Sequence, residues 1–329
     1  MQKLDSITTK KLSWDKTPLD SRLEFNIKGK NITYTILNSL RRTIQSDIPI
    51  YAFTKINITK NTSVFNNNYM RLRLENLPVF GLENKHEIYI PEKKKSEEEE
   101  FDEAMGIVPD DIDMDVEESV NTSSLEQITM YVNYKNDTNE IVTVTTEDAK
   151  FYFAEKNIKS PYVNPVPIIK LQPNQEISLS AISTLGVEKL SSIFSPVSIC
   201  TYKEKSDHDY DLILESRGQL TEKRILQVAI TNINSQLNKF IKLVPDNKGM
   251  EGTIELPNAD HTLGNIIADG LNLHSSVSFA GYNMPHPLDN KIVFHYKLES
   301  GNIKKVLEDI VSYYENLFTN LEKQVSKLN

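Results

Sequence analysis

The stretch from residue 258 to residue 288 constrains the fold most, because it places a capped amphipathic helix directly before a strand and a proline turn. Asp260 and Thr262 are both residue types that accept backbone N–H bonds at the start of a helix. Leu263, Ile266, Ile267 and Leu271 then recur at spacings of three and four, which is typical of a helix with one apolar face, here from Leu263 to about Leu273. The pattern predicts a helix over about 260–273 that packs against another helix.

Glycines and prolines refine this prediction. Gly264 and Gly270 lie on or beside the apolar face, although glycine lowers helix stability by about 0.5–1 kcal/mol relative to alanine. Their presence indicates a close approach by another backbone. Residues 277–281 alternate as a strand does, and Pro285 with Pro287 then restricts the chain to an extended turn.

The same stretch resembles the signature of the small alpha-like subunit of cellular RNA polymerases, archaeal subunit L and its eukaryotic eleventh-subunit counterpart. That family has a DHTLGN helix start, an AGY step in the strand and a PHPL turn. Here these motifs stand at residues 260–265, 280–282 and 285–288. Agreement in three spaced motifs implies that the carboxy-terminal part of the chain has the fold of this subunit.

An earlier stretch, residues 38–79, resembles the large alpha-like subunit, archaeal D or the eukaryotic third subunit. The positions that match its pattern are Asn38, Leu40, Arg41, Arg42, Ser46, Asp47, Pro49, Ala52, Asn61, Thr62, Ser63, Arg73, Leu74 and Pro78. The return segment of that family is matched by Gly186, Ser195, Pro196, Val197, Glu215, Ser216 and Gly218. The family usually has His-Arg-Leu-Gly where this chain has Leu72-Arg73-Leu74-Glu75, so the local turn can differ.

Residues 35–40 can be aligned with residues 262–267, so the two halves resemble divergent copies of one unit. The resemblance implies an α+β fold in which two alpha-like units, of the DCoH-like RNA polymerase alpha dimerisation type, pair intramolecularly. Joining the units raises the effective concentration of each for the other, commonly to about millimolar. Fused pairs of this kind are associated with large DNA viruses of eukaryotes.

The expected organisation has four parts: an N-terminal tail (1–19), a discontinuous large unit (20–82 and 171–243), an inserted mostly β domain (83–170) and a small unit (245–329). Within the insert, residues 128–134 and 141–145 alternate like strands around a polar turn and predict a hairpin. Residues 219–243 and 303–328 both carry apolar residues at helical spacing, which predicts two helices that pack together.

The acidic residues are concentrated in one place. The net charge is −9, and residues 92–118 hold thirteen Asp and Glu against three Lys, a net of −10, so the rest of the chain sums to +1. This acidic loop is predicted to be solvated, or to act as a tether to a basic partner surface. The near-neutral remainder predicts no dedicated DNA-binding face and no direct sequence-specific contact with DNA.

Neither a membrane span nor a signal peptide is predicted, because no apolar run approaches about 20 residues and the first residues lack an apolar core. Cys200 is the single cysteine, which fits a reducing intracellular compartment and excludes a Cys-ligated zinc or iron–sulfur site. We expect its thiol to be buried rather than reactive. The expected location is the host cytoplasm, at a viral factory, or the virion, and the nucleus remains open.

His208, His261 and His286 invite a metal-binding or catalytic interpretation. The sequence, however, has no HExxH helix, nucleophile elbow, Walker loop or dinucleotide fingerprint. A histidine beside a helix start is more often a cap or a packing residue. We therefore expect no catalytic residue, no metal and no cofactor in this chain.

Arg41 and Arg42 are the foremost candidates for partner binding. Neighbouring helical residues point about 100° apart, so one arginine can brace the fold while the other faces outward. A planar guanidinium can pair with a carboxylate through two hydrogen bonds, which suits a rigid protein interface better than lysine does. The alternative is a pair of ordinary solvated arginines.

The resemblance implies a non-catalytic assembly-platform subunit of a multisubunit DNA-directed RNA polymerase, which brings the beta-like and beta-prime-like catalytic subunits together. A small tenth-subunit-like protein is a further expected partner. The alternatives are a free regulatory module that binds a host RNA polymerase and a histidine-dependent hydrolase. The expected subunit-interface residues are Asn38, Leu40, Arg41, Arg42, Asp47, Arg73, Ser195, Pro196, Val197, Glu215, Gly218, Asp260, His261, Leu263, Gly264, Asn265, Ile267 and His286.

Overall fold

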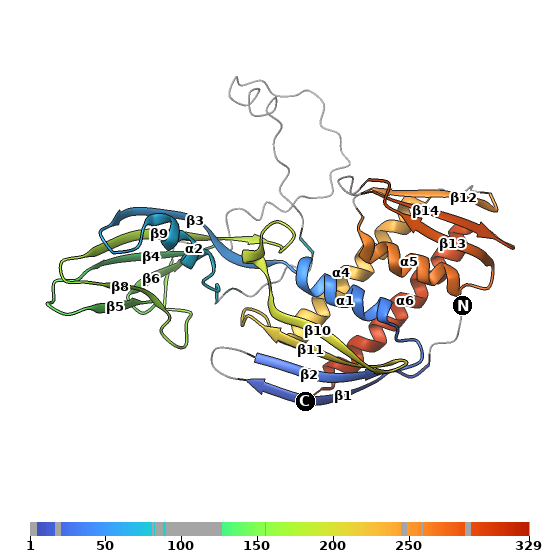
Figure 1. The fold of residues 1–329 in the computed structure, drawn as a ribbon, viewed down its shortest axis with the longest axis horizontal. Helices are drawn as coiled ribbons and strands as arrows, with labels where there is room; N and C mark the ends of the chain where they lie inside the picture. Colours follow the sequence, from blue (N-terminus) through green and yellow to red (C-terminus); the bar gives the residue numbers. More distant parts are fainter. Residues whose placement is uncertain are drawn as a thin grey trace, which may run out of the picture.

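Helices lie between antiparallel sheets at one end of the molecule, and a β-rich domain forms the other end (Figure 1). The computed structural model describes residues 5–16, 21–80, 82, 88–89, 127–154, 156–244, 249–257, 259–286 and 291–328. The predicted acidic loop 92–118 lies outside these residues, as do Pro287 and Leu288 of the predicted turn.

The large unit is a four-stranded antiparallel sheet with helices on its inner face. Its strands, in spatial order, are β1 (Thr8–Lys16), β2 (Ser21–Lys28), β11 (Asp209–Ser216) and β10 (Val197–Ser206). Leu23, Phe25 and Ile27 alternate toward the core and are fully buried. Residues 8–16, which the sequence placed in an N-terminal tail, instead form an edge strand paired with β2.

The helices of the large unit are α1 (Tyr34–Ser46) and α4 (Glu222–Leu243). Thr33 caps α1 by accepting a hydrogen bond from the backbone N–H of Ile36, and Thr221 caps α4 in the same way. The helix predicted over 219–243 is therefore confirmed, with its start at residue 222.

The small unit repeats this plan on a smaller scale. Its sheet has the order β12 (Glu251–Pro257), β14 (Lys291–Leu298) and β13 (Val277–Asn283), and its helices are α5 (His261–Leu273) and α6 (Ile303–Ser326). The Asp260 carboxylate accepts a hydrogen bond from the Thr262 N–H at 2.9 Å and so caps α5. The helix predicted over about 260–273 and the strand after it are confirmed.

The two units share one hydrophobic core. Helix α1 packs on α5, and α4 packs on α6, as the apolar spacing of the two long helices predicts. Leu40 and Ile44 of α1, Ile267 of α5 and Leu317 of α6 belong to the same cluster of buried side chains. Burying each such side chain contributes about 1.5–3 kcal/mol before entropy costs, so the helix contacts hold the two units together.

The β-rich domain has a separate core. Its five-stranded sheet has the order β3 (Ile50–Asn61), β9 (Glu176–Gly186), β4 (Ile128–Lys135), β6 (Ala149–Phe153) and β7 (Lys156–Ile158). A two-stranded sheet of β5 (Val142–Thr145) and β8 (Pro167–Leu171) and the helix α2 (Asn67–Glu75) complete it. The insert was expected to span residues 83–170. Because β3 starts at residue 50 and β9 ends at residue 186, the β-rich domain includes chain on both sides of that range.

The hairpin predicted from residues 128–134 and 141–145 is wrong. Strand β4 pairs with β6 and β9, whereas β5 pairs with β8 in the other sheet. Asn136, which is buried, explains the difference because its side-chain Nδ2 donates to the carbonyl oxygens of Glu140 and Leu171. These two bonds direct the chain after β4 toward β8 instead of back along β4.

Among the helices that the structure describes, none combines the length and the apolar character needed to cross a membrane.

Candidate subunit interface

The contact between α1 and α5 is polar at one end. Nε of Arg42 on α1 donates to Oγ1 of Thr262 on α5 at 2.9 Å, and Nη2 of Arg42 lies 3.6 Å from the Asp260 carboxylate. Oγ of Ser39 donates to the Thr262 carbonyl oxygen at 3.5 Å. Arg42 therefore connects the large unit to the helix start of the small unit within one chain.

Lys189 joins the same cluster from the segment that follows β9. Its Nζ lies 2.5 Å from the Asp47 carboxylate and 3.5 Å from that of Asp260, and its backbone N–H donates to the Ser46 carbonyl. Asp47 caps the end of α1. We call Arg42, Asp47, Lys189, Asp260 and Thr262 the junction cluster, which ties α1, α5 and the return from the β-rich domain together.

The two carboxylates of the junction cluster differ in pKa. Burial raises the pKa of Asp47 above its ordinary value, and the Lys189 charge offsets this only in part. Burial also disfavours the charged form of Asp260, but Lys189, the hydrogen bonds from Thr262 and Arg42 together lower its pKa below the ordinary value. Asp260 is thus the carboxylate whose charge the fold favours.

Arg41 points in another direction and is held by its own helix. Its Nε and Nη2 donate to Oδ1 of Asn38, and its Nη1 donates to Oε1 of Gln45. Each terminal nitrogen carries a second N–H, for which the described residues show no partner. Tyr34, four residues before Asn38 and so on the same side of the helix, is 68% exposed. This face of α1 therefore presents a guanidinium in a fixed orientation.

Residues from the return segment form a corner where β10 starts and β11 ends. Oγ of Ser195 donates to the Val197 carbonyl, and the backbone N–H of Arg217 donates to that of Pro196. Gly218 follows with a φ of 89°, a conformation that glycine adopts without strain. Glu215 of β11 lies opposite Arg22 of β2 in the strand register, so this corner belongs to the sheet of the large unit.

Arg73 is not near the other predicted residues. It lies on α2 in the β-rich domain, where its guanidinium donates to the backbone carbonyls of Pro167 and Ile168 at 3.2 Å. These bonds hold α2 against β8. Its role within this chain is structural.

The start of α5 carries a second polar group. The His261 Nδ1 and the Tyr282 hydroxyl lie 3.2 Å apart, and that hydroxyl donates to Oδ1 of Asn265. His261 is exposed and acts as a packing and hydrogen-bonding residue beside the helix start, as does His208, whose Nδ1 lies 2.8 Å from the Ile32 carbonyl oxygen. His286 is exposed. The described residues contain no group of three or more potential metal ligands.

The close approach predicted at Gly264 and Gly270 comes from side chains, and the prediction of a neighbouring backbone is wrong. A Cβ at Gly264 would lie 2.8 Å from the Tyr282 ring. A Cβ at Gly270 would lie 2.5 Å from Cγ2 of Ile310 and 2.8 Å from the Tyr314 ring, both on α6. Glycine at 270 therefore allows α5 and α6 to approach.

Several predicted interface residues are buried within the chain itself. Leu40, Val197, Leu263 and Ile267 are all less than 10% exposed, so they present little surface to another subunit. Val197 packs within the large unit, whereas the other three lie on the paired helices α1 and α5. Sequence reasoning missed Lys189 and Gln45. Neither lies in a periodic pattern or a motif, and only the pairing of distant segments brings Lys189 to the junction cluster.

Two like units, paired through α1 and α5 around one core, make this chain a dimer-like platform in a single polypeptide. Residues 26–237 match the model of the RNA polymerase Rpb3/Rpb11 dimerisation domain, and residues 251–324 match a second model with the same description. The chain belongs to this family, with the large and the small alpha-like unit fused.

The relatives of this chain include RNA polymerase subunits of a virus and of two archaea. The chain is 29% identical over 330 residues to a putative DNA-directed RNA polymerase subunit of Acanthamoeba polyphaga mimivirus, which covers 94% of this chain and 91% of that protein. It is 25% identical over 179 residues to subunit Rpo3 of Methanocaldococcus jannaschii, covering 54% of this chain and 83% of the relative. A stretch of 40 residues is 55% identical to subunit Rpo11 of Saccharolobus solfataricus, and it covers 12% of this chain and 44% of that subunit.

Proposed function

We propose that this chain is the non-catalytic assembly platform of a multisubunit DNA-directed RNA polymerase, and that it brings the beta-like and beta-prime-like catalytic subunits together. The observation that carries this proposal is the intramolecular pairing of α1 with α5, which joins the two regions that match Rpb3/Rpb11 dimerisation domains within one chain. The mimivirus relative makes a viral polymerase the setting that we propose.

The rigid face of α1 supports a role for Arg41 in partner binding. Its guanidinium is oriented by Asn38 and Gln45 before any partner arrives, so binding a carboxylate or carbonyl of a catalytic subunit would order few additional groups. Arg42, in contrast, is already engaged by Thr262 and Asp260. We therefore assign Arg41 to the contact with a catalytic subunit and Arg42 to the contact between the two units. A small tenth-subunit-like protein would occupy a neighbouring surface.

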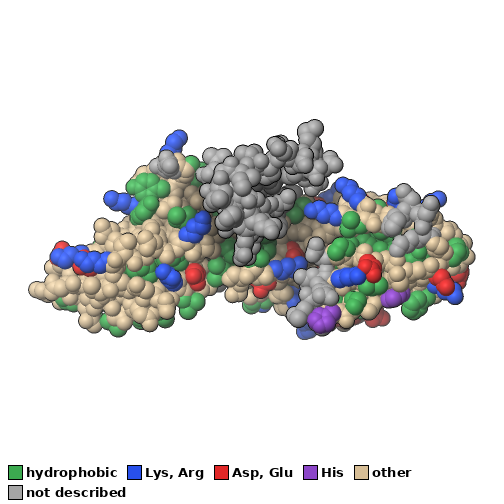
Figure 2. Space-filling view, turned by 90° about the horizontal axis from the view of Figure 1, so that it is seen from above, with side chains coloured by type: hydrophobic (Ala, Val, Ile, Leu, Met, Phe, Trp, Pro, Cys, Tyr) green, Lys and Arg blue, Asp and Glu red, His purple; other side chains and the backbone are tan. Residues whose placement is uncertain are grey.

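The distribution of basic side chains does not favour direct binding of nucleic acid by this chain. On the face shown in Figure 2, Lys and Arg side chains are scattered among hydrophobic and acidic ones instead of gathered in one patch. Phosphate binding requires clustered basic side chains. Contact with DNA would therefore be made by the partners.

The test is purification of the tagged chain from its native expression setting, with mass spectrometry of the partners and an assay of template-dependent RNA synthesis. Recovery of two large virus-encoded chains with activity would support the platform. Recovery of host polymerase subunits would support the regulatory module instead. Recovery of the chain alone would refute both.

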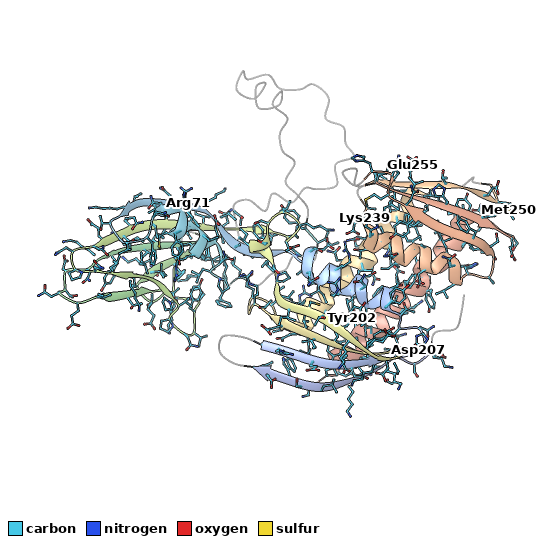
Figure 3. All side chains as sticks on the ribbon, viewed as in Figure 1. Arg71, Tyr202, Asp207, Lys239, Met250 and Glu255 are labelled. Carbon is cyan, nitrogen blue, oxygen red and sulfur yellow. The ribbon has the colours of Figure 1, made fainter. Side chains whose placement is uncertain are left out.

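A charge reversal sharpens the test. Arg41→Glu should reduce the recovery of the catalytic subunits by about tenfold or more. The substitution replaces a hydrogen-bond-donating guanidinium with a carboxylate, which a carboxylate or carbonyl oxygen of the partner would repel. Arg71→Glu is the matched control, since Arg71 is an exposed arginine on α2, at the far end of the molecule from the small unit (Figure 3). Equal recovery with Arg41→Glu and wild type would remove Arg41 from the interface.

A further inference from the structure

Edge strands differ in how they are protected against pairing with another chain. Natural proteins protect such edges with charged residues, prolines or very short strands. Among the edge strands of five or more residues that the structure describes, each contains a charged residue or a proline except one. The protected strands are β1, β3, β8, β10 and β12, and the exception is β13, with the sequence VSFAGYN.

The two edges of the small-unit sheet show the contrast directly. Strand β12 carries Glu251 and Glu255, and these carboxylates lie 3.5 Å and 2.5 Å from the ammonium groups of Lys297 and Lys291 on β14. Glu255 is labelled in Figure 3, at the end of the molecule opposite the β-rich domain. One sheet therefore has a charged edge and an uncharged edge.

Exposed apolar side chains lie on β13 and at the end of α5, the helix that packs on this strand. Phe279 of β13 is 59% exposed and Leu273, at the end of α5, is 38% exposed. A Cβ at Gly281 would lie 3.6 Å from Cζ of Phe279, so the ring lies over Gly281 along the strand. An exposed ring in this position costs hydrophobic free energy in water, which a covering side chain would recover.

Helix α5 covers part of the edge. Nδ2 of Asn272 donates to the Ala280 carbonyl at 3.2 Å. Ser278 also uses its hydroxyl to bond the Lys297 carbonyl within the sheet. A strand added at β13 would pair with the remaining backbone groups or replace the Asn272 amide at Ala280.

We propose that β13 is a strand-addition site, where an extended segment of another polymerase subunit adds a fourth strand to the β12–β14–β13 sheet. The backbone groups of an edge select an extended peptide, and the lack of charge on β13 selects an uncharged one. An apolar side chain of that segment would lie on Phe279. This inference rests on the proposed function only in taking the partner from the polymerase.

The test is amide hydrogen exchange of residues 277–283, measured on the free chain and on the purified, active complex. The inference predicts exchange slower by on the order of tenfold or more in the complex for the amides that face the edge. Equal exchange in both states would overturn it. Protection that appears in the free chain as its concentration rises would also overturn it, because a second copy would then occupy the edge.

A substitution links the protection to the edge itself. Phe279→Lys introduces the kind of charge that the other edges carry, and it should abolish the added protection while the free chain stays folded, because the side chain is exposed. Val163→Lys is the matched control, since Val163 is 92% exposed in the β-rich domain. If the wild-type chain recovers active polymerase but β13 shows no protection, the inference fails while the proposed function stands.

Discussion

Nε of Arg42 on α1 lies 2.9 Å from Oγ1 of Thr262 on α5, and this hydrogen bond joins two alpha-like units that are distant in sequence. The same guanidinium lies 3.6 Å from Asp260, the residue that caps α5. One arginine thus binds both the cap and the first turn of the opposite helix. Its neighbour Arg41 bonds only residues of its own helix in the part of the chain that the structure describes.

Replacing Arg42 by alanine should destabilise the pairing of the units. The arginine side chain is 40% exposed, so the loss should be about 1 kcal/mol in the free energy of unfolding, less than for a buried ion pair. Urea denaturation of the purified chain measures it. Arg41→Ala should cost less, because its partners lie on the same helix. An equal loss for both variants would contradict this division of roles.

Gly270→Ala should lower stability although alanine favours helices. The added Cβ would lie 2.5 Å from Cγ2 of Ile310 and would separate α5 from α6, which should cost about 1–3 kcal/mol. Thermal unfolding followed by circular dichroism is the measurement. Gly249→Ala serves as the control, because the nearest atom to its Cβ is 3.7 Å away. A stable Gly270→Ala variant would show that α6 moves aside freely.

The Asp260 carboxylate should make stability depend on pH. Its pKa is lower in the folded chain than in the unfolded chain, so its charge stabilises the fold above the unfolded-state pKa of about 4, and this contribution is lost as the pH falls through the folded-state pKa. Asp260→Asn keeps a capping side chain but removes the charge. The difference in unfolding free energy between wild type and this variant should therefore shrink on acidification below about pH 4.

Asp47 should give a pH dependence of stability opposite in sign to that of Asp260, because burial raises its pKa in the folded chain. Its ionisation costs stability as the pH rises through the folded-state pKa. Relative to wild type, Asp47→Asn should therefore gain stability with rising pH over that range. If the unfolding free energy relative to wild type changed with pH in the same direction for Asp260→Asn and Asp47→Asn, the opposite pKa shifts of the two carboxylates would be incorrect.

Cys200 should be unreactive in the native chain. Burial raises the pKa of its thiol to about 12, with the nearby Arg41 charge offsetting only part of the shift, so almost no thiolate exists at pH 8. Alkylation by iodoacetamide at that pH should be slower than in urea by more than about a hundredfold. Mass spectrometry of the modified peptide gives both rates. Fast labelling of the native chain would indicate that β10 opens readily.

The sequence by itself determined the elements that depend on local pattern. The Asp260 cap and the apolar spacing from Leu263 to Leu271 predicted α5, and the long apolar stripe predicted α6 and its contact with α4. Motifs in both halves indicated the family, which the family models confirm. These features follow from neighbours within a few positions, so a single stretch of chain contains enough information to specify them.

Only the tertiary structure decided which distant segments meet. The hydroxyls of Thr54 and Thr184 lie 2.9 Å apart across β3 and β9, and this pairing places both strands in the β-rich domain. The tertiary structure likewise paired β5 with β8 and brought Lys189 to the junction cluster. It also gave Arg42 a partner on α5, whereas Arg41 bonds residues of α1. Such contacts depend on the packing of whole sheets and helices, which no local spacing encodes, because many strand pairings satisfy the same alternation of residues.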